Sequence, residues 1–344
     1  MTSALLQFPD PFNTLSKLPA LVVGPLGGVI VTPDGEVETY ALSELRKILR
    51  DHDFLICNRP VNERHLQADL SGCFDILELF AFVRPAEFCL PLPLGLTVAL
   101  ELPGTDDNHE DEAAVLIRSA QLLFNELISP GYKYSEGVQA TAYTMSAAGW
   151  KWGPLILGAL KNAEKQQDYQ VWAHLTEWEE KAPPPPPGQE RVSEEETKQR
   201  LNRLLGDQAE NREGQIDYAV KAARAFDLPE SEDEPTLVLS EAGTGIGKTL
   251  GYIAPSSLWA EKNGGTVWLS TYTKNLQRQL DQELDRLYAN EKEKKQKVVI
   301  RKGRENYLCL LNLQEISTTA AQPQGKILLG LVSRWVRYSR DGDM

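Results

Sequence analysis

The stretch "EAGTGIGKTL", residues 241–250, has the spacing of a phosphate-binding loop. It matches the pattern G-x-x-x-x-G-K-[ST] when Ala242 stands in the place of the first glycine. The glycines allow successive backbone N–H groups to turn inward and surround phosphate oxygens, at the start of a helix, which favours anions. The stretch therefore predicts a site for the phosphates of a nucleotide.

The residues around this loop support the same interpretation. The apolar run "TLVLS" (236–240) predicts a strand before the loop, and "TLGYIAPSSLWAE" (249–261) predicts a helix after it, which is the context that the motif needs. The alternative is a glycine-rich turn with a chance lysine. We expect Lys248 to reach the β- and γ-phosphates, and the Thr249 hydroxyl to bind Mg²⁺. The predicted ATP and Mg²⁺ site consists of Gly243, Thr244, Gly245, Gly247, Lys248 and Thr249, the last two being catalytic.

The bulk composition is that of an ordinary globular protein. The 344 residues are enough for two domains, and 42% of them are hydrophobic. A net charge of -13 argues against a nucleic-acid coat protein, but it is compatible with a motor that binds nucleic acid in a local groove. No run of apolar residues is long enough to span a bilayer, and the 4 cysteines show no close pairs. We expect a cytoplasmic protein without a membrane partner.

A run of prolines divides the chain. The stretch "KAPPPPPGQE" (181–190) contains five consecutive prolines, which cannot lie within a helix or a central strand. We place a linker at 181–192, between a domain at 1–180 and a domain at 193–344. Directly after it, Ser193 and Glu196 predict a capping box at a helix start, followed by an apolar stripe of leucines at 201, 204 and 205.

The region before the prolines predicts an α/β domain. The runs 19–24 and 27–40 predict strands, with a hairpin turn at Asp34 and Gly35. Helices are predicted at 41–52 and 111–128, and a buried strand at 54–58. Strands that alternate with helices are typical of the α/β class. Four tryptophans are expected to be packing residues: Trp150, Trp152, Trp172 and Trp178.

With Glu241 two residues before the first glycine, the loop resembles those of superfamily-two helicases. The resemblance implies that Arg212 and Gln215, in "REGQ", form the motif that reads adenine, since a glutamine amide can pair with a donor and an acceptor on the base. The alternative is a solvated helix start. The stretch "GGTVWLSTYTKNLQRQL" (264–280) is similar to the strand and polar helix that grip the phosphates of single-stranded DNA. Its candidate DNA-binding residues are Ser270, Thr271, Thr273, Lys274 and Gln277.

The stretch "KGRENYLC" (302–309) resembles the "KGRxNYxC" signature of the DinG-type, XPD-like DNA helicases. The resemblance covers residues 205–344. It implies a RecA-like motor domain that uses ATP to unwind single-stranded or forked DNA in the 5′→3′ direction, during replication or repair. In that family the cysteine is the first of four ligands to a [4Fe–4S] cluster, so Cys309 would be a metal ligand in a complete protein. Arg301 and Arg304 are further candidates for DNA binding.

The sequence also departs from this family. Cys309 is the last cysteine, and one thiolate cannot hold a [4Fe–4S] cluster, so none is expected in this chain. Neither a D-E-x-H box nor a second motor domain follows the loop. We therefore expect an N-terminal fragment of a helicase, truncated within the cluster insertion, and leave open whether it is an enzyme. The alternative is a non-catalytic nucleotide- or DNA-binding module, or a decayed gene product.

A second resemblance concerns the N-terminal domain. The stretch "CNRPVNERHL" (57–66) resembles a worn form of the "hNxxFDxxxL" motif of DEDD-type exonucleases, with Asn62 at the position of the catalytic aspartate. "FDILELFAFVRP" (74–85) is similar to the segment that follows, headed by Asp75. The resemblance implies a ribonuclease H-like fold. Because hydrolysis by two metal ions needs four clustered carboxylates, and residues 20–31 contain none, we expect a degenerate, non-catalytic domain. The alternative is an unrelated α/β domain.

Overall fold

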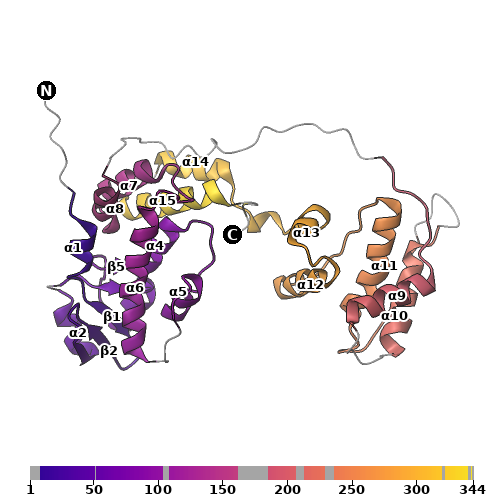
Figure 1. Ribbon diagram of the computed structural model, residues 1–344, viewed down its shortest axis with the longest axis horizontal. Helices are drawn as coiled ribbons and strands as arrows, with labels where there is room; N and C mark the ends of the chain where they lie inside the picture. The colour runs from indigo at the N-terminus through magenta and orange to yellow at the C-terminus, as the bar shows by residue number, and fades with distance from the viewer. Residues whose placement is uncertain are drawn as a thin grey trace. The chain divides into compact units, whose positions relative to one another are not determined.

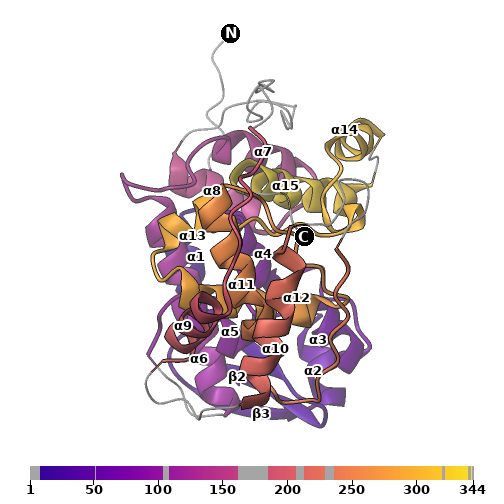
Figure 2. The ribbon, with the colours of Figure 1, turned by 90° about the vertical axis from the view of Figure 1, so that its right-hand side faces the viewer.

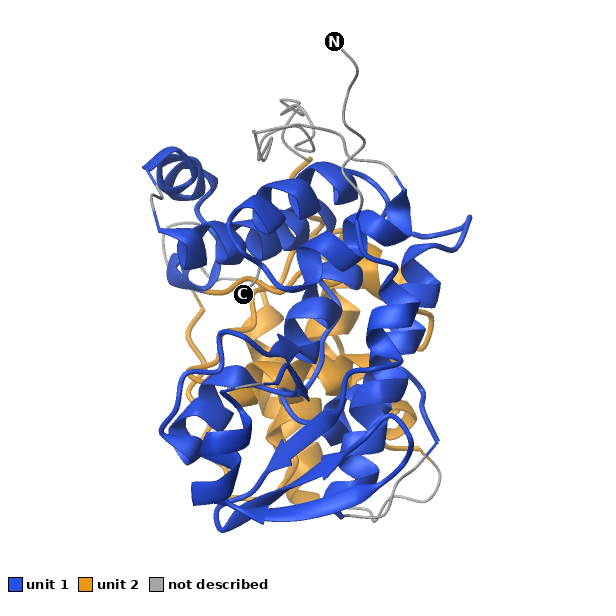
Figure 3. Ribbon diagram, turned by 90° about the vertical axis from the view of Figure 1, so that its left-hand side faces the viewer, with its two compact units in different colours: residues 1–177, 303–344 blue, residues 178–302 orange. Residues whose placement is uncertain are grey.

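The computed structural model describes residues 8–50, 52–103, 108–161, 185–206, 213–228, 236–319, 322–339 and 342. The chain forms two compact units (Figure 3). Unit 1 comprises residues 1–177 and 303–344, and unit 2 comprises residues 178–302. The first boundary between the units, after residue 177, lies close to the expected proline linker at 181–192. Residues 185–192 of this linker have no regular secondary structure, and residues 181–184 lie outside the described ranges. Residues 303–339, which the sequence analysis placed in the motor domain, pack within unit 1.

Unit 1 is an α/β structure built on a mixed five-stranded sheet of order β3-β2-β1-β4-β5. Strands β1, β2 and β3 pair antiparallel, whereas β1–β4 and β4–β5 pair parallel. The predicted hairpin between β2 and β3 is confirmed, and Gly35 adopts the positive φ (87°) that such a turn requires. The strands are β1 (Ala20–Val23), β2 (Gly27–Val31), β3 (Val37–Ala41), β4 (Leu55–Ile56) and β5 (Phe74–Asp75).

Helices cover both faces of this sheet (Figure 1). Alternating side chains point to opposite faces of a strand, so Leu21 joins one core cluster while Ala20 and Val22 join the other. The cluster around Leu21 is closed by α2 and α3, and the cluster around Ala20 by α4, α6 and α8. The helices from the first part of the chain are α1 (Pro11–Leu15), α2 (Leu42–Ile48), α3 (Arg59–Leu66), α4 (Ile76–Val83), α5 (Pro93–Ala99), α6 (His109–Leu127), α7 (Val138–Ala147) and α8 (Trp152–Leu160).

The predicted packing role of two tryptophans is confirmed. Trp150 and Trp152 are buried, and each indole N–H donates a hydrogen bond. Trp152 donates to the carbonyl oxygen of Asp75 (2.8 Å), and Trp150 to a carboxylate oxygen of Glu78 (2.8 Å). Both therefore bury a large ring without leaving its polar atom unsatisfied. Trp172 and Trp178 lie outside the described residues.

Unit 1 is completed by two helices from the end of the chain, α14 (Leu310–Thr319) and α15 (Pro323–Tyr338). Helix α15 packs against α4 and α7 (Figures 1 and 2). Its Arg334 is 1% exposed and lies over the Phe82 ring. The guanidinium donates to the carbonyl oxygens of residues 82, 134 and 136 and to the Tyr132 hydroxyl, at 2.8–3.1 Å. These acceptors satisfy a charge whose burial would otherwise be costly.

Unit 2 is helical in its described part. Its core contains leucines of α9 and residues of α10, α11 and α12, and the predicted stripe is confirmed because Leu201 and Leu204 are buried. Its helices are α9 (Glu194–Leu205), α10 (Glu213–Ala223), α11 (Lys248–Asn263), α12 (Lys274–Leu287) and α13 (Glu291–Lys297). None of the helices in the described ranges of the whole chain is long and apolar enough to cross a bilayer.

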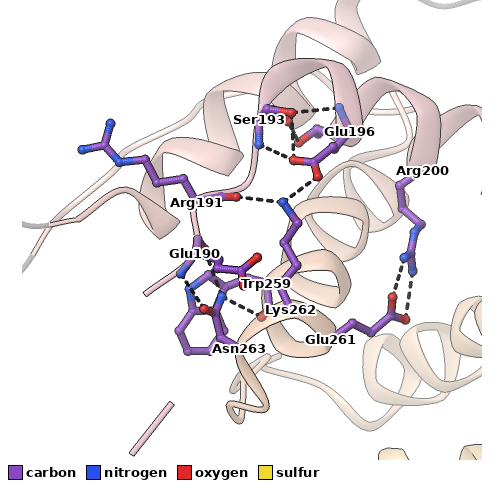
Figure 4. A network of polar contacts seen from close by, with 10 residues as sticks. Glu190, Arg191, Ser193, Glu196, Arg200, Trp259, Glu261, Lys262 and Asn263 are labelled. Atoms are coloured by element: carbon purple, nitrogen blue, oxygen red, sulfur yellow. Dashed lines mark hydrogen bonds and ion pairs between the residues drawn. The ribbon is translucent and has the colours of Figure 1, made fainter. Parts of the chain in front are cut away.

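A network of polar contacts holds the start of α9 against the end of α11 (Figure 4). The predicted capping box is confirmed: the Ser193 hydroxyl accepts from the Glu196 N–H, and the Glu196 carboxylate accepts from the Ser193 N–H. The same carboxylate pairs with Lys262 at 2.5 Å. The Lys262 ammonium, followed by the Ser193 donors, lowers the pKa of Glu196 to about 2.

The structure corrects one set of predicted elements. Neither 236–240 nor 264–270 forms a strand; both lack regular secondary structure. Val238 is half-buried, but Leu237 and Leu239 are 81% and 89% exposed. A strand is held by hydrogen bonds to a neighbouring strand, and in the described part of unit 2 no such partner is present. The apolar sequence therefore has strand propensity without the pairing that a sheet requires.

We predict that Arg334→Ala destabilises unit 1. Truncation leaves the buried carbonyl oxygens of residues 82 and 134 without this donor, and each unsatisfied buried group costs about 1–3 kcal/mol. We expect a loss of about 3 kcal/mol or more in the free energy of unfolding, measured by urea denaturation, with faster hydrogen exchange in α7 and α15. Arg118→Ala, at an exposed arginine of α6, is the control and should stay within about 0.5 kcal/mol of the wild type. Equal stability of the two variants would refute the anchoring role.

We predict that Glu196 makes the free energy of unfolding depend on pH. Its pKa is lower in the folded protein than in the unfolded chain, so its stabilising contribution is present above the unfolded pKa and is lost as the pH falls toward about 2. The difference in unfolding free energy between wild type and Glu196→Gln should be constant above about pH 5.5 and shrink below about pH 4.5. Urea titrations across this range measure it. A difference that grows on acidification would contradict the assignment.

Candidate nucleotide-binding and nucleic-acid-binding sites

The glycine loop of unit 2 directly precedes α11, which begins at Lys248. Gly245 and Gly247 have φ angles of 81° and 88°, in the left-handed region that side chains rarely adopt. Gly243, Thr244, Gly245 and Gly247 are exposed. The loop thus has the backbone freedom to turn its N–H groups toward a ligand at the positive end of a 16-residue helix.

The side chains of Lys248 and Thr249 already make contacts at this loop. The Lys248 ammonium donates to the Ala242 carbonyl oxygen at 2.8 Å, so it folds back over the loop that it follows. Burial raises the pKa of Tyr252, one turn later, and the nearby Thr249 side chain acts to lower it. The ammonium is exposed, and its partner among the described residues is a neutral acceptor, so a phosphate oxygen would bind it more strongly.

Gln215 reaches the same loop from α10. It is buried, and its Nε2 donates to the Gly247 carbonyl oxygen at 2.9 Å. A Cβ atom on Gly247 would lie 2.3 Å from that Nε2, so the glutamine side chain fills the space beside the glycine. Gln215 is therefore next to the loop, as the predicted adenine contact requires, and it also supports the loop backbone. Arg212 lies outside the described residues.

The residues predicted to bind DNA form a second group in unit 2. Ser270 and Lys274 are exposed, and Thr271 is half-buried. The Thr273 hydroxyl accepts from the Leu276 N–H (3.2 Å), so it caps α12. Gln277 donates from Nε2 to the Arg301 carbonyl oxygen at 3.0 Å, which brings the two predicted segments together.

The other two predicted residues of this region lie in unit 1. Arg304 is exposed in a short 3₁₀ turn, and Cys309 is an exposed free thiol. Among the described residues, no three or more His, Cys, Asp or Glu side chains gather as a metal-binding group. The residues present do not fit a [4Fe–4S] cluster, which needs four thiolates in one place.

In unit 1 the exonuclease-like residues have structural roles. Asp75 is buried, and its carboxylate accepts from the N–H groups of Asn58, Arg59 and Leu77 at 2.7–3.2 Å. It thus caps α4 and binds the chain where α3 begins. Burial raises the pKa of Asp75, against the effect of these donors. Asn62 is also buried, and its Nδ2 donates to the Cys57 carbonyl oxygen at 2.7 Å.

Sequence reasoning missed the Gln215–Gly247 packing and the Lys248–Ala242 bond, because both depend on how α10 and the loop meet in space. It also passed over Tyr272, which lies between the predicted DNA-binding residues and is 99% exposed. Here a signal was available. Val267 and Leu269 alternate in the sequence with Thr266, Trp268 and Ser270, a period of two that puts Tyr272 on the outward side. In the structure the side chains at 266, 268, 270 and 272 are exposed and those between them half-buried.

Comparison with known proteins finds relatives that are named helicases or exonucleases, each matched over part of its length. It is 31% identical over 148 residues to the ATP-dependent DNA helicase YoaA of Haemophilus influenzae, covering 41% of this chain and 22% of the relative. It is 38% identical over 114 residues to the ATP-dependent helicase DinG of Mycobacterium tuberculosis (32% of this chain, 16% of the relative). It is 34% identical over 107 residues to the 3′-5′ exonuclease DinG of Bacillus subtilis (31% and 11%).

These relatives confirm the predicted resemblance: the chain contains a region related to the N-terminal part of DinG-type helicases. The matched segments cover about a fifth or less of the relatives' own length. No family model matches the chain. No solved structure matches it either.

We predict that Gly247→Ala disturbs the loop more than Gly245→Ala. Both alanines suffer the strain of a positive φ, about 1–2 kcal/mol, but only the one at 247 collides with Gln215. Displacing that side chain adds an overpacking cost of about 1–3 kcal/mol. We expect a lower melting temperature for Gly247→Ala and faster hydrogen exchange at the start of α10. Identical behaviour of the two variants would show that Gln215 does not support the loop.

Proposed function

We propose that this chain supplies the ATP-binding part and a DNA-binding part of a DinG-type, ATP-dependent DNA helicase that moves 5′→3′. The single observation that carries the proposal is the loop at 243–247, where positive-φ glycines lead into α11 and Lys248 follows at its first position. The proposal is supported by relatives that are named ATP-dependent helicases. We assign the nucleotide to unit 2, where this loop lies.

The loop would bind ATP through its phosphates. The backbone N–H groups at 243–247 would surround the phosphate oxygens, and Lys248 would exchange the Ala242 carbonyl for the β- and γ-phosphates. Thr249 would offer its hydroxyl to Mg²⁺. Held there, Mg²⁺ would supply positive charge that neutralises the phosphates. Gln215, beside the loop, would read the adenine edge, together with Arg212.

DNA is the proposed partner of the second group in unit 2. Ser270, Thr271, Thr273, Lys274 and Gln277 would hold its phosphates together with Arg301, and Arg304 would add a further contact. The bond from Gln277 to the Arg301 carbonyl supports this grouping, because it keeps the Arg301 segment beside the start of α12. The Thr273 hydroxyl caps α12, and it can also help to position a phosphate because it lies at the helix N-terminus.

Unit 1 is proposed to be a degenerate exonuclease-like domain of ribonuclease H-like fold that docks or guides DNA without cutting it. Its mixed five-stranded sheet is compatible with that fold, and one relative carries the name of a 3′-5′ exonuclease. The absence of activity is supported by Asp75, whose carboxylate is occupied by three backbone N–H groups, and by Asn62, which cannot bind a metal as a carboxylate does.

We predict that Lys248→Ala weakens ATP binding by about 10- to 100-fold. The variant loses one charge-assisted hydrogen bond to phosphate, of about 1.5–3 kcal/mol. Titration of a fluorescent ATP analogue with Mg²⁺ measures the affinity. Lys292→Ala, at an exposed lysine of α13, is the matched control and should bind like the wild type. Equal affinity of Lys248→Ala and wild type would remove the phosphate-loop assignment.

A further inference from the structure

Two aromatic side chains of unit 2 face solvent beside the proposed DNA-binding residues. Trp268 is 77% exposed and Tyr272 is 99% exposed. Both belong to the alternating stretch 266–272 and lie on its outward side. None of the ring–ring or cation–ring contacts in the described part of the chain involves either residue. Tyrosine and tryptophan normally bury 150–250 Å² each, so this exposure leaves two aromatic faces available to a partner.

Three basic residues near these rings are exposed, and their ion pairing differs from that of other basic residues in the described part of unit 2. Lys274 and Arg278 are exposed one turn apart on α12, and Arg301 is exposed on the segment that Gln277 holds. None of the three takes part in an ion pair within the described residues. The neighbouring basic residues differ, because Lys294 pairs with Asp281 and Asp285, and Lys295 and Lys297 pair with glutamates of their own helix.

Unpaired cations beside exposed aromatic faces match the chemistry of one kind of ligand. Single-stranded nucleic acid offers phosphates to the cations and base faces to the rings, whereas a duplex hides its base faces in the stack. An acidic protein partner would use the cations but has no need of the rings. The combination therefore favours a single strand, and its sequence should matter little because every base has an aromatic face.

We infer that Tyr272, together with Trp268, is a stacking platform for unpaired bases of a DNA strand whose phosphates are held by Lys274, Arg278 and Arg301. This inference rests on the proposed function and deepens it, since it names a binding residue that contacts bases rather than phosphates. We expect Tyr272 to contribute more to stacking than Trp268. Trp268 is less exposed, and it also borders a cavity of about 290 Å³ between its own segment and the helices.

The test compares strands with and without bases. The full chain is titrated with a fluorescent oligothymidylate and with an abasic strand of the same length, over a series of salt concentrations. We expect Tyr272→Ala to bind the oligothymidylate about 5- to 100-fold more weakly than the wild type, and Tyr272→Phe to bind it normally because the ring remains. On the abasic strand, wild type and Tyr272→Ala should be equal. Phe88→Ala, at an exposed aromatic of unit 1, is the matched control and should change nothing.

The salt series separates stacking from charge. Lys274→Ala should weaken both strands alike and reduce the slope of log affinity against log salt by about 1, whereas Tyr272→Ala should leave the slope unchanged. The inference is overturned if Tyr272→Ala loses affinity equally for both strands, or loses none for the oligothymidylate. It is also overturned if the wild type binds a duplex more tightly than a single strand, or binds no single strand. Binding of the ATP analogue is measured on the same samples, so that a failure of the nucleotide site is distinguished from a failure of stacking.

Discussion

The burial of one guanidinium group holds unit 1 together. Arg334 comes from α15, near the end of the sequence, yet its acceptors are carbonyl oxygens at residues 82, 134 and 136 and the Tyr132 hydroxyl. None of these acceptors is a carboxylate, so the charge is stabilised by oriented dipoles and by the Phe82 ring rather than by a counter-ion. Because a buried charge is costly unless every donor is used, the positions of α4, α15 and the segment before α7 depend on one another.

This arrangement makes unit 1 a discontinuous body, with unit 2 inserted between its two parts. Within unit 1, polar side chains that resemble a nuclease site serve the fold instead. Asp75 binds three backbone N–H groups where α3 and α4 begin, and Asn62 binds a carbonyl oxygen. A carboxylate that accepts three backbone N–H groups has few lone pairs left for a metal ion, so Asp75 serves the starts of two helices rather than a metal site.

The two proposed binding groups of unit 2 share one local design. Each lies after an extended, partly apolar stretch and at the start of a helix: the glycine loop before α11, and residues 270–274 before α12. In both, a lysine near the start of the helix is exposed, Lys248 in the first and Lys274 in the second. Before the second group, Leu269 packs against the core of unit 2. The loop is supported by Gln215 of α10, and the second group by the bond from Gln277 to the Arg301 segment.

The sequence alone determined the local features, which depend only on residues that are close together along the chain. The capping box at Ser193, the turn at Gly35, the helix after the glycine loop and the leucine stripe of α9 were all predictable, because spacing and side-chain chemistry act over a few residues. The helicase resemblance was likewise legible in three short motifs. Tertiary structure decided the rest. Strand propensity at 236–240 did not produce a strand, since pairing needs a distant partner. The anchoring of α15 could not be foreseen, because an arginine in a helix looks solvated until acceptor oxygens from 198 to 252 residues away surround it.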